Sequence, residues 1–117
     1  MAQEIIFSEG NFAFVKKSGI GAHDTPWEGL EVISSGNAEK HVVTIQLDSL
    51  LFPRFNGKPV RYTYNGVYVK HGNRGVSDTL NDTIEYIEVL QEAVRFSKKV
   101  IDWLNQNPQW KDWVDCI

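Results

Sequence analysis

The sequence predicts an α+β fold, in which an antiparallel β-sheet of four to six strands precedes a long C-terminal α-helix and a short terminal helix. Two observations support this prediction. Through residue 71 the chain consists of short apolar runs separated by glycine, asparagine and other polar residues. From Asp78 to Gln106, apolar residues instead recur at spacings of three, four and seven. A chain of 117 residues suits a single domain, residues 1–117, with one modest core.

The composition is that of an ordinary globular protein, with 42% hydrophobic and 23% charged residues. The first residues include Glu4 and no long apolar run, so we expect no signal peptide. The sequence contains no stretch of about 18 successive apolar residues, which is the length that predicts a membrane-spanning helix. The single cysteine, Cys116, excludes a disulfide framework. We therefore expect a cytoplasmic protein that does not bind a membrane.

The N-terminal half is expected to form strands. The runs EIIF and FAFVK, separated by SEGN, predict a hairpin. Residues 16–29 contain three glycines and one proline, which predicts a surface loop. The next strands are expected at LEVIS and HVVTIQL, residues 30–34 and 41–47, with the polar segment SGNAEK between them.

Asn65-Gly66 predicts a second hairpin, because Asn-Gly is the strongest short signal for a two-residue turn. Such a turn pairs RYTY with VYVK and sets Arg61 opposite Lys70, a like-charge pair. An anionic ligand or an acidic residue from elsewhere in the chain would neutralise this pair; alternatively, the two long side chains extend into water. The alternation predicts two faces. The expected core face consists of Tyr62, Tyr64, Val67 and Val69, and the expected outer face of Arg61, Thr63, Tyr68 and Lys70.

The long helix contains two apolar rows, which together cover more than half of its circumference. The first, expected from its spacing to define the helix, comprises Leu80, Ile84, Ile87, Leu90, Val94, Ile101 and Leu104. The second comprises Val89, Ala93, Phe96, Val100 and Trp103. One sheet face cannot bury both rows. We therefore predict that a short helix from Pro108 covers part of the surplus. We also predict a homodimer through the long helix, because the second row, with Phe96, Val100 and Trp103, remains available to a partner. The alternative is that Val89 and Ala93 are simply exposed.

Charge is distributed unevenly along the chain. No acidic residue occurs between Asp48 and Asp78, an interval that contains Arg54, Lys58, Arg61, Lys70 and Arg74. The net charge is +5 within this interval and −8 outside it, since the total is −3. Aromatic residues are interspersed with these cations. A surface of this kind suits single-stranded nucleic acid, because the cations track phosphates and the rings stack on bases.

The segment VKHGNRGVSDT, residues 69–79, leads into the long helix. Free N–H groups at a helix N-terminus favour an anion. The segment matches neither a P-loop nor a dinucleotide-binding motif. Alternatively, Gly72 and Gly75 serve only the turn, and Asp78 satisfies the helix N-terminus. The residues predicted to bind the ligand are Arg61, Tyr68, Lys70, His71, Arg74 and Ser77.

No residue pattern indicates catalysis. The three histidines lack the spacing of a helical zinc site, and no cysteine pair is present. His23-Asp24 resembles a base with its orienting partner, but a polar surface loop explains both residues more simply. We therefore expect a protein without enzymatic activity, metal or other cofactor.

Two functional hypotheses follow from these patterns. In the first, the protein binds an anionic ligand, either single-stranded nucleic acid or a nucleotide, through the basic aromatic hairpin and the glycine-containing loop. In the second, it is a small inhibitor of a protein target, of the immunity or phage anti-defence type. Such an inhibitor would contact its target through the acidic residues outside the interval between Asp48 and Asp78, or through its tryptophan surface. A protein that sequesters a nucleotide signal would combine both hypotheses.

Overall fold

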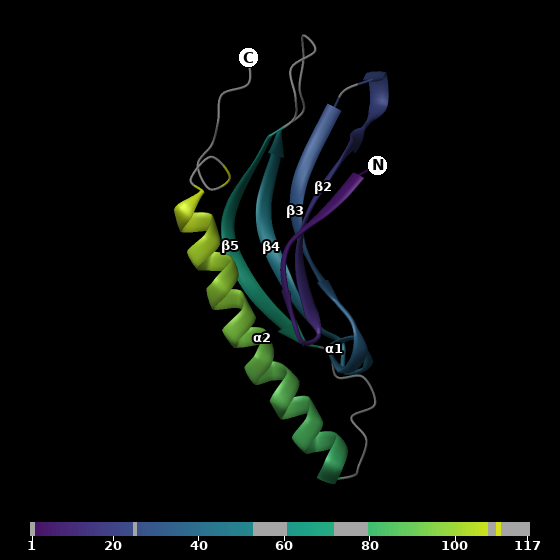
Figure 1. The fold of residues 1–117 in the computed structure, drawn as a ribbon, viewed down its shortest axis with the longest axis vertical. Coiled ribbons are helices and arrows are strands. Elements are labelled where there is room, and N and C mark those ends of the chain that lie inside the picture. Colours follow the sequence, from purple (N-terminus) through teal and green to yellow (C-terminus); the bar gives the residue numbers. More distant parts are fainter. Residues whose placement is uncertain (1, 25, 53–60, 72–79, 108–109, 111–117) are drawn as a thin grey trace.

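The computed structural model describes residues 2–24, 26–52, 61–71, 80–107 and 110. Five strands and two α-helices make up most of this part of the chain (Figure 1). In chain order the elements are β1 (Ala2–Glu9), β2 (Phe12–Ile20), a short 3-10 turn (Ala22–Asp24), β3 (Pro26–Ser34), α1 (Gly36–Lys40), β4 (Val43–Phe52), β5 (Arg61–His71) and α2 (Leu80–Gln106).

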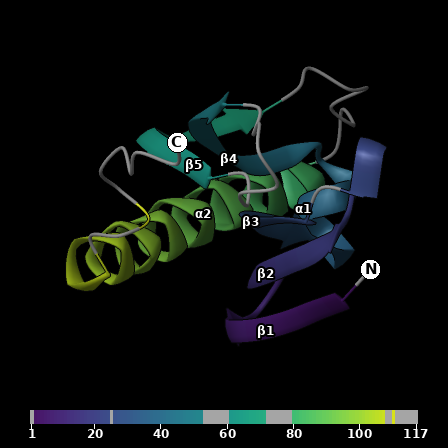
Figure 2. The same ribbon diagram turned by 90° about the horizontal axis from the view of Figure 1, so that it is seen from above.

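The strands form two antiparallel sheets, one of β1-β2-β3 and one of β4-β5. Strand β3 lies beside β4, so all five strands follow one another in a curved layer, with α2 packed against one face (Figures 1 and 2). The α+β class and the long C-terminal helix are therefore confirmed. The expected single sheet of four to six strands is instead a three-stranded and a two-stranded sheet.

The first hairpin is confirmed. Strands β1 and β2 pair up to Glu9 and Phe12, and the two residues between them form the turn. Gly10 has φ 56° there, a left-handed conformation that glycine adopts without steric cost.

The surface loop predicted for residues 16–29 is wrong. Strand β2 continues to Ile20 and β3 begins at Pro26, so only residues 21–25 connect them. Each glycine of the paired part lies opposite a large residue: Gly19 opposite Trp27, and Gly29 opposite Lys17. The continuous ladder of backbone hydrogen bonds outweighs the low strand propensity of these glycines.

The hairpin predicted at Asn65-Gly66 is also wrong. Residues 61–71 form one strand, which pairs with β4 from Arg61 opposite Phe52 to His71 opposite Val43. The register shifts beside Asp48, and Asn65 is the extra residue of a bulge. Glycine in a strand often marks a bulge, so the same dipeptide suits either structure. The predicted pairing of Arg61 with Lys70 is accordingly wrong.

The predicted alternation is confirmed for residues 67–70, whose side chains the structure describes. Val67 and Val69 pack against the core, whereas Tyr68 and Lys70 are exposed, as expected. The polar segment SGNAEK was expected only to join two strands. It contains α1, which buries Ala38 against the core.

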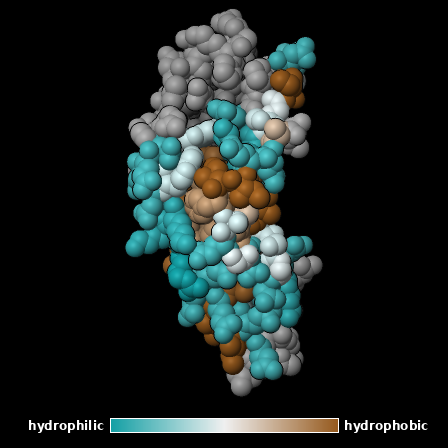
Figure 3. All heavy atoms as spheres, viewed as in Figure 1, coloured by the Kyte–Doolittle hydropathy of each residue, from teal (hydrophilic) through white to brown (hydrophobic). Residues whose placement is uncertain are grey.

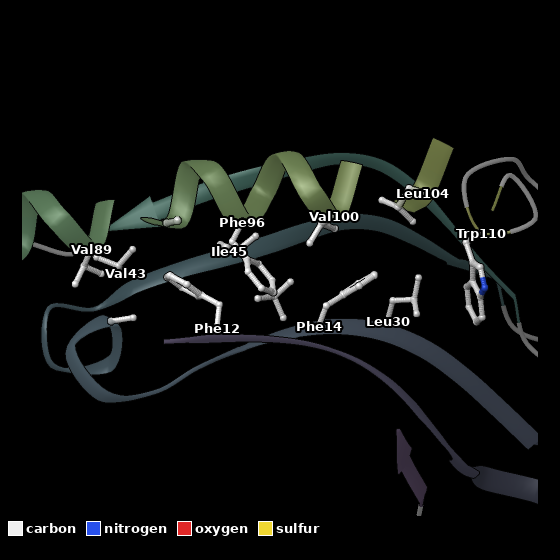
Figure 4. Close-up of a cluster of buried hydrophobic side chains, with 13 residues drawn as sticks. Phe12, Phe14, Leu30, Val43, Ile45, Val89, Phe96, Val100, Leu104 and Trp110 are labelled. Atoms are coloured by element: carbon white, nitrogen blue, oxygen red, sulfur yellow. The ribbon is translucent and has the colours of Figure 1, made fainter. Parts of the chain in front are cut away.

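The core lies between α2 and the curved layer (Figure 4). Phe96 is fully buried, and its ring centroid lies 5.2 Å from that of Phe7 and 5.6 Å from that of Phe12. Trp103 packs edge-on against Phe14, with 5.2 Å between ring centroids. The helix contributes Val89, Ala93, Phe96, Val100 and Leu104, and the strands contribute Phe12, Phe14, Leu30, Val32, Val43 and Ile45.

The two apolar rows of α2 therefore have the opposite roles from those expected. The second row, with its aromatic residues, fills the sheet side. Four residues of the first row are exposed: Ile84 by 45%, Ile87 by 47%, Val94 by 62% and Ile101 by 42%. Of the same row, Leu90 is half-buried and Leu104 is buried. The suggestion that Val89 and Ala93 are exposed is wrong.

Helix α2 ends at Gln106, as the following Pro108 predicts. The side chain of Asn107 donates a hydrogen bond to the Trp103 carbonyl at 2.9 Å. Trp110 is buried in the core. The rest of the predicted terminal helix lies outside the described residues. Within the described ranges, no helix is long and apolar enough to cross a membrane.

Val94 and Val100 provide a matched test of which row faces the core. Val100→Ala should cost about 1.5–3 kcal/mol of unfolding free energy, because Val100 is fully buried. Val94→Ala should change it by less than about 0.5 kcal/mol, because Val94 is mostly exposed. Urea denaturation of both variants, at a protein concentration too low for a dimer to form, measures the difference. Equal losses would contradict the orientation of α2.

Candidate functional site

The candidate site is the side of the β4–β5 ladder that points away from the core. It presents Tyr68 opposite Gln46 and Lys70 opposite Thr44, and all four side chains are exposed. We call these four residues the outer β4–β5 face. Val67 and Val69 fix its orientation, because their burial forces the alternate side chains outward.

Lys70 differs from the other described lysines of the sheets. Lys16 pairs with Glu4 at 3.8 Å, and Lys17 pairs with Glu31. Within the described residues, Lys70 makes no ion pair. The nearest acidic position by register is Asp48, which lies opposite Gly66 and two residues beyond Gln46. An exposed ring beside an unpaired cation is suited to contact with a base and its phosphate.

The other predicted site residues are dispersed. Arg61 begins β5 and Lys70 is nine residues further along. At about 3.3 Å per residue, their backbones are roughly 30 Å apart. His71 ends the strand, opposite Val43. Tyr68 and Lys70 thus share one face near one end of β5, and the backbone of Arg61 lies at the other end of the strand. Arg74, Ser77 and the glycine-containing loop lie outside the described residues.

A second group of polar residues connects α2 to the sheet. The Glu92 carboxylate accepts hydrogen bonds from the Asn11 backbone N–H at 2.7 Å and from the Asn11 side-chain amide at 3.1 Å. The Asn11 side-chain oxygen accepts from the Asn37 backbone N–H at 3.0 Å. The Asn11 carbonyl accepts from the Ser35 backbone N–H at 2.9 Å. One residue therefore joins the β1–β2 turn, the start of α1 and the middle of α2.

Glu85 forms a comparable contact with α1. Its Oε1 lies 2.9 Å from His41 Nε2 and 3.1 Å from Lys40 Nζ. The hydrogen bond from His41, followed by that from Lys40, lowers the pKa of Glu85 below its ordinary value. His41 is buried, and its ring lies 5.6 Å from that of Tyr86. Because His41 caps the C-terminus of α1 and Glu85 lies on α2, this pair links the two helices, and we call it the Glu85 clamp.

Lys99 and Glu9 make a third contact of the same kind, at 2.6 Å. The hydrogen bond from Lys99 lowers the pKa of Glu9. Glu85, Glu92 and Lys99 are seven residues apart, so they lie in one row on α2. We call them the polar row. Among the described residues, no cluster of histidine, cysteine, aspartate or glutamate side chains is able to hold a metal ion.

The chain matches no known family model, and no curated protein or solved structure is significantly similar to it.

Sequence reasoning missed the polar row and its partners. Asn11 and Glu92 are 81 residues apart, and His41 and Glu85 are 44 apart. No feature of the sequence near either residue of such a pair indicates that the two are in contact. The one available signal was the repeat of charged residues at seven-residue spacing on α2, which is equally typical of a solvated helix face.

Gly10 tests the contact between the first turn and α2. An added Cβ there would lie 2.7 Å from the Glu92 carboxylate, and the residue would retain a left-handed φ. Gly10→Ala should destabilise the protein by about 1–3 kcal/mol, through strain and displacement of Glu92. In a Glu92→Ala background the penalty should be smaller, since the clash is absent. Equal penalties in urea denaturation would show that Gly10 and Glu92 do not interact.

The Glu85 clamp should make stability depend on pH. A carboxyl group whose pKa is lowered on folding contributes stability above its unfolded pKa, about 4.3. This contribution is lost as the pH falls through the lower folded value. Glu85→Gln should therefore reduce stability at pH 6, and the difference from wild type should shrink below about pH 4. Glu39→Gln, at an exposed position on α1, is the control. A Glu85→Gln penalty independent of pH would contradict this assignment.

Proposed function

We propose that the protein is a non-enzymatic binding protein for an anionic ligand and that this ligand is single-stranded nucleic acid. The main supporting observation is the outer β4–β5 face, where exposed Tyr68 adjoins Lys70. Rings on a sheet stack bases without regard to sequence, and cations beside them neutralise phosphates.

The unbroken course of β5 favours a polymer over a mononucleotide. Arg61 and Lys70 occupy opposite ends of one strand, roughly 30 Å apart. A single nucleotide is too short to contact both. A single strand that runs along β5 is long enough to extend from one position to the other, and OB folds that bind single strands cover about 4–16 nucleotides.

An inhibitor of a protein target is the second candidate. The observation that favours it is the set of exposed apolar residues on α2. Contiguous exposed apolar surface is typical of sites that bind proteins. The acidic residues outside the interval between Asp48 and Asp78 give the inhibitor hypothesis less support. Four of them each pair with a lysine: Glu4, Glu9, Glu31 and Glu85.

The proposal also includes a homodimer through α2, since the helix has more apolar surface than its own sheet covers. The aromatic row first expected at that interface is occupied by the core. The exposed row is the surface that remains for a second copy.

The binding proposal is tested by fluorescence anisotropy with labelled single-stranded oligonucleotides at several salt concentrations. Wild type should bind, and affinity should fall as salt rises. Lys70→Ala should reduce the slope of log affinity against log salt by about 0.7. Tyr68→Ala should cost about 1–3 kcal/mol, whereas Tyr68→Phe should retain most affinity, because stacking needs only the ring. Lys17→Ala, at a lysine already paired with Glu31, should leave the slope unchanged.

Calorimetry with mononucleotides distinguishes the ligand classes. If a mononucleotide binds more tightly than the oligonucleotide, the ligand is a nucleotide and not a polymer. If wild type binds neither ligand at low salt, the anionic-ligand proposal is wrong and the inhibitor hypothesis takes its place.

A further inference from the structure

Recognition of a particular base requires polar side chains. Figure 3 shows apolar atoms, in brown, gathered in the middle of the visible face, with hydrophilic atoms, in teal, around them. The hydrophobic effect is non-directional, so such a surface does not distinguish one base from another. On the outer β4–β5 face, by contrast, exposed polar side chains adjoin an aromatic ring. We therefore looked for base specificity among the polar residues of that face.

Gln46 is the cross-strand neighbour of Tyr68 on the outer β4–β5 face. The register sets the two residues directly opposite each other, and such neighbours have Cβ atoms about 4.5–5.5 Å apart. Both side chains are exposed, so the Tyr68 ring does not cover Gln46. Among the described residues, the Gln46 amide has no side-chain hydrogen bond. This amide is therefore available to a ligand that lies on the Tyr68 ring.

The amide of Gln46 suits the edge of a base. Its oxygen accepts hydrogen bonds and its nitrogen donates them, so it fits an edge on which a donor and an acceptor are neighbours. The bases of a single strand present their Watson–Crick and Hoogsteen edges to side chains in this way. A base stacked on Tyr68 extends beyond the smaller phenol ring and reaches the neighbouring strand, where Gln46 lies.

The other polar residues of the face do not discriminate between bases. Lys70 carries a point charge, which attracts the phosphate of any nucleotide. Thr44 lies opposite Lys70, and its hydroxyl both donates and accepts, so it pairs with either kind of group on a base. Only the amide of Gln46 presents a donor and an acceptor at a fixed separation.

Adenine fits this amide best. Its 6-amino donor lies between two ring acceptors, N1 and N7, so the amide forms a bidentate pair on either edge. Glutamine forms this pair with N6 and N7 of adenine in duplex DNA. Guanine presents only acceptors, O6 and N7, on the corresponding edge. The pyrimidines have a single ring and therefore a smaller surface for stacking on Tyr68.

We propose that Gln46 is a specificity-determining residue, which binds the edge of an adenine stacked on Tyr68. This inference rests on the proposed binding of single-stranded nucleic acid, and it specifies the base that this position prefers. Tyr68 supplies affinity for any base, Lys70 attracts the adjacent phosphate, and Gln46 selects the base.

Fluorescence anisotropy with two matched oligonucleotides tests the proposal. The adenine strand is a run of deoxyadenosine; the purine strand has the same length but lacks every 6-amino group. Both have the same phosphate charge and the same fused rings. Gln46→Met keeps the length of the side chain and removes the amide. This variant should bind the adenine strand about 5- to 150-fold more weakly than wild type does. It should bind the purine strand as tightly as wild type does, with an unchanged salt slope, because no charge is lost.

Two further variants serve as controls. Gln3→Met replaces an exposed glutamine of β1, in the other sheet, and should change the affinity for neither strand. Tyr68→Ala should weaken the binding of both strands by the same factor, because stacking does not require the amino group. Comparison of ratios between proteins cancels the different stacking of the two free oligonucleotides.

The outcomes separate this inference from the binding proposal. Equal losses on both strands in Gln46→Met would show that Gln46 acts without contact to the base edge. Unchanged affinity for both strands would show that it makes no contact at all. Either result overturns the inference and leaves the binding proposal standing. If wild type binds no oligonucleotide at low salt, the binding proposal is wrong and this inference fails with it.

Discussion

The contact between Asn11 and Glu92 determines how the long helix lies on the sheet. Apolar residues cover more than half of α2, so hydrophobicity alone allows several rotations about its axis. The polar row permits only one of them. It faces the β1–β2 turn and α1, where Asn11, Glu9 and His41 supply its partners. Buried or half-buried polar groups are costly when unpaired, so this rotation is strongly preferred.

This rotation has consequences on both sides of the helix. It brings Phe96 into contact with the phenylalanine rings of the sheet and so determines the core. It also leaves Ile84, Ile87, Val94 and Ile101 exposed on a part of the helix away from the polar row. Strand β5 contributes to both sides of the sheet: Val67 and Val69 pack against the core, and Tyr68 and Lys70 belong to the outer β4–β5 face.

The charge asymmetry of the sequence produces an unpaired cation on β5 but no continuous acidic surface, and ion pairs explain this difference. Several acidic residues outside the interval between Asp48 and Asp78 are neutralised by lysines, either across strands or between α2 and its neighbours. The negative remainder is therefore not one continuous acidic surface. Lys70 makes no such ion pair within the described residues, and this separates it from the paired lysines of β2. An unpaired cation retains its full attraction for phosphate, which is the basis of the proposed function.

The sequence by itself determined the fold class, the first hairpin, the extent of α2 and the alternation that exposes Tyr68 and Lys70. These features depend on periodicity and turn chemistry over a few residues. Only the tertiary structure decided that Asn65 forms a bulge, that residues 16–20 and 26–29 are strands, and which row of α2 is buried. An Asn-Gly pair suits a bulge or a turn, and two apolar rows suit a core equally well. The choice between such alternatives depends on partners far along the chain, as in the contact of Glu92 with Asn11, 81 residues away.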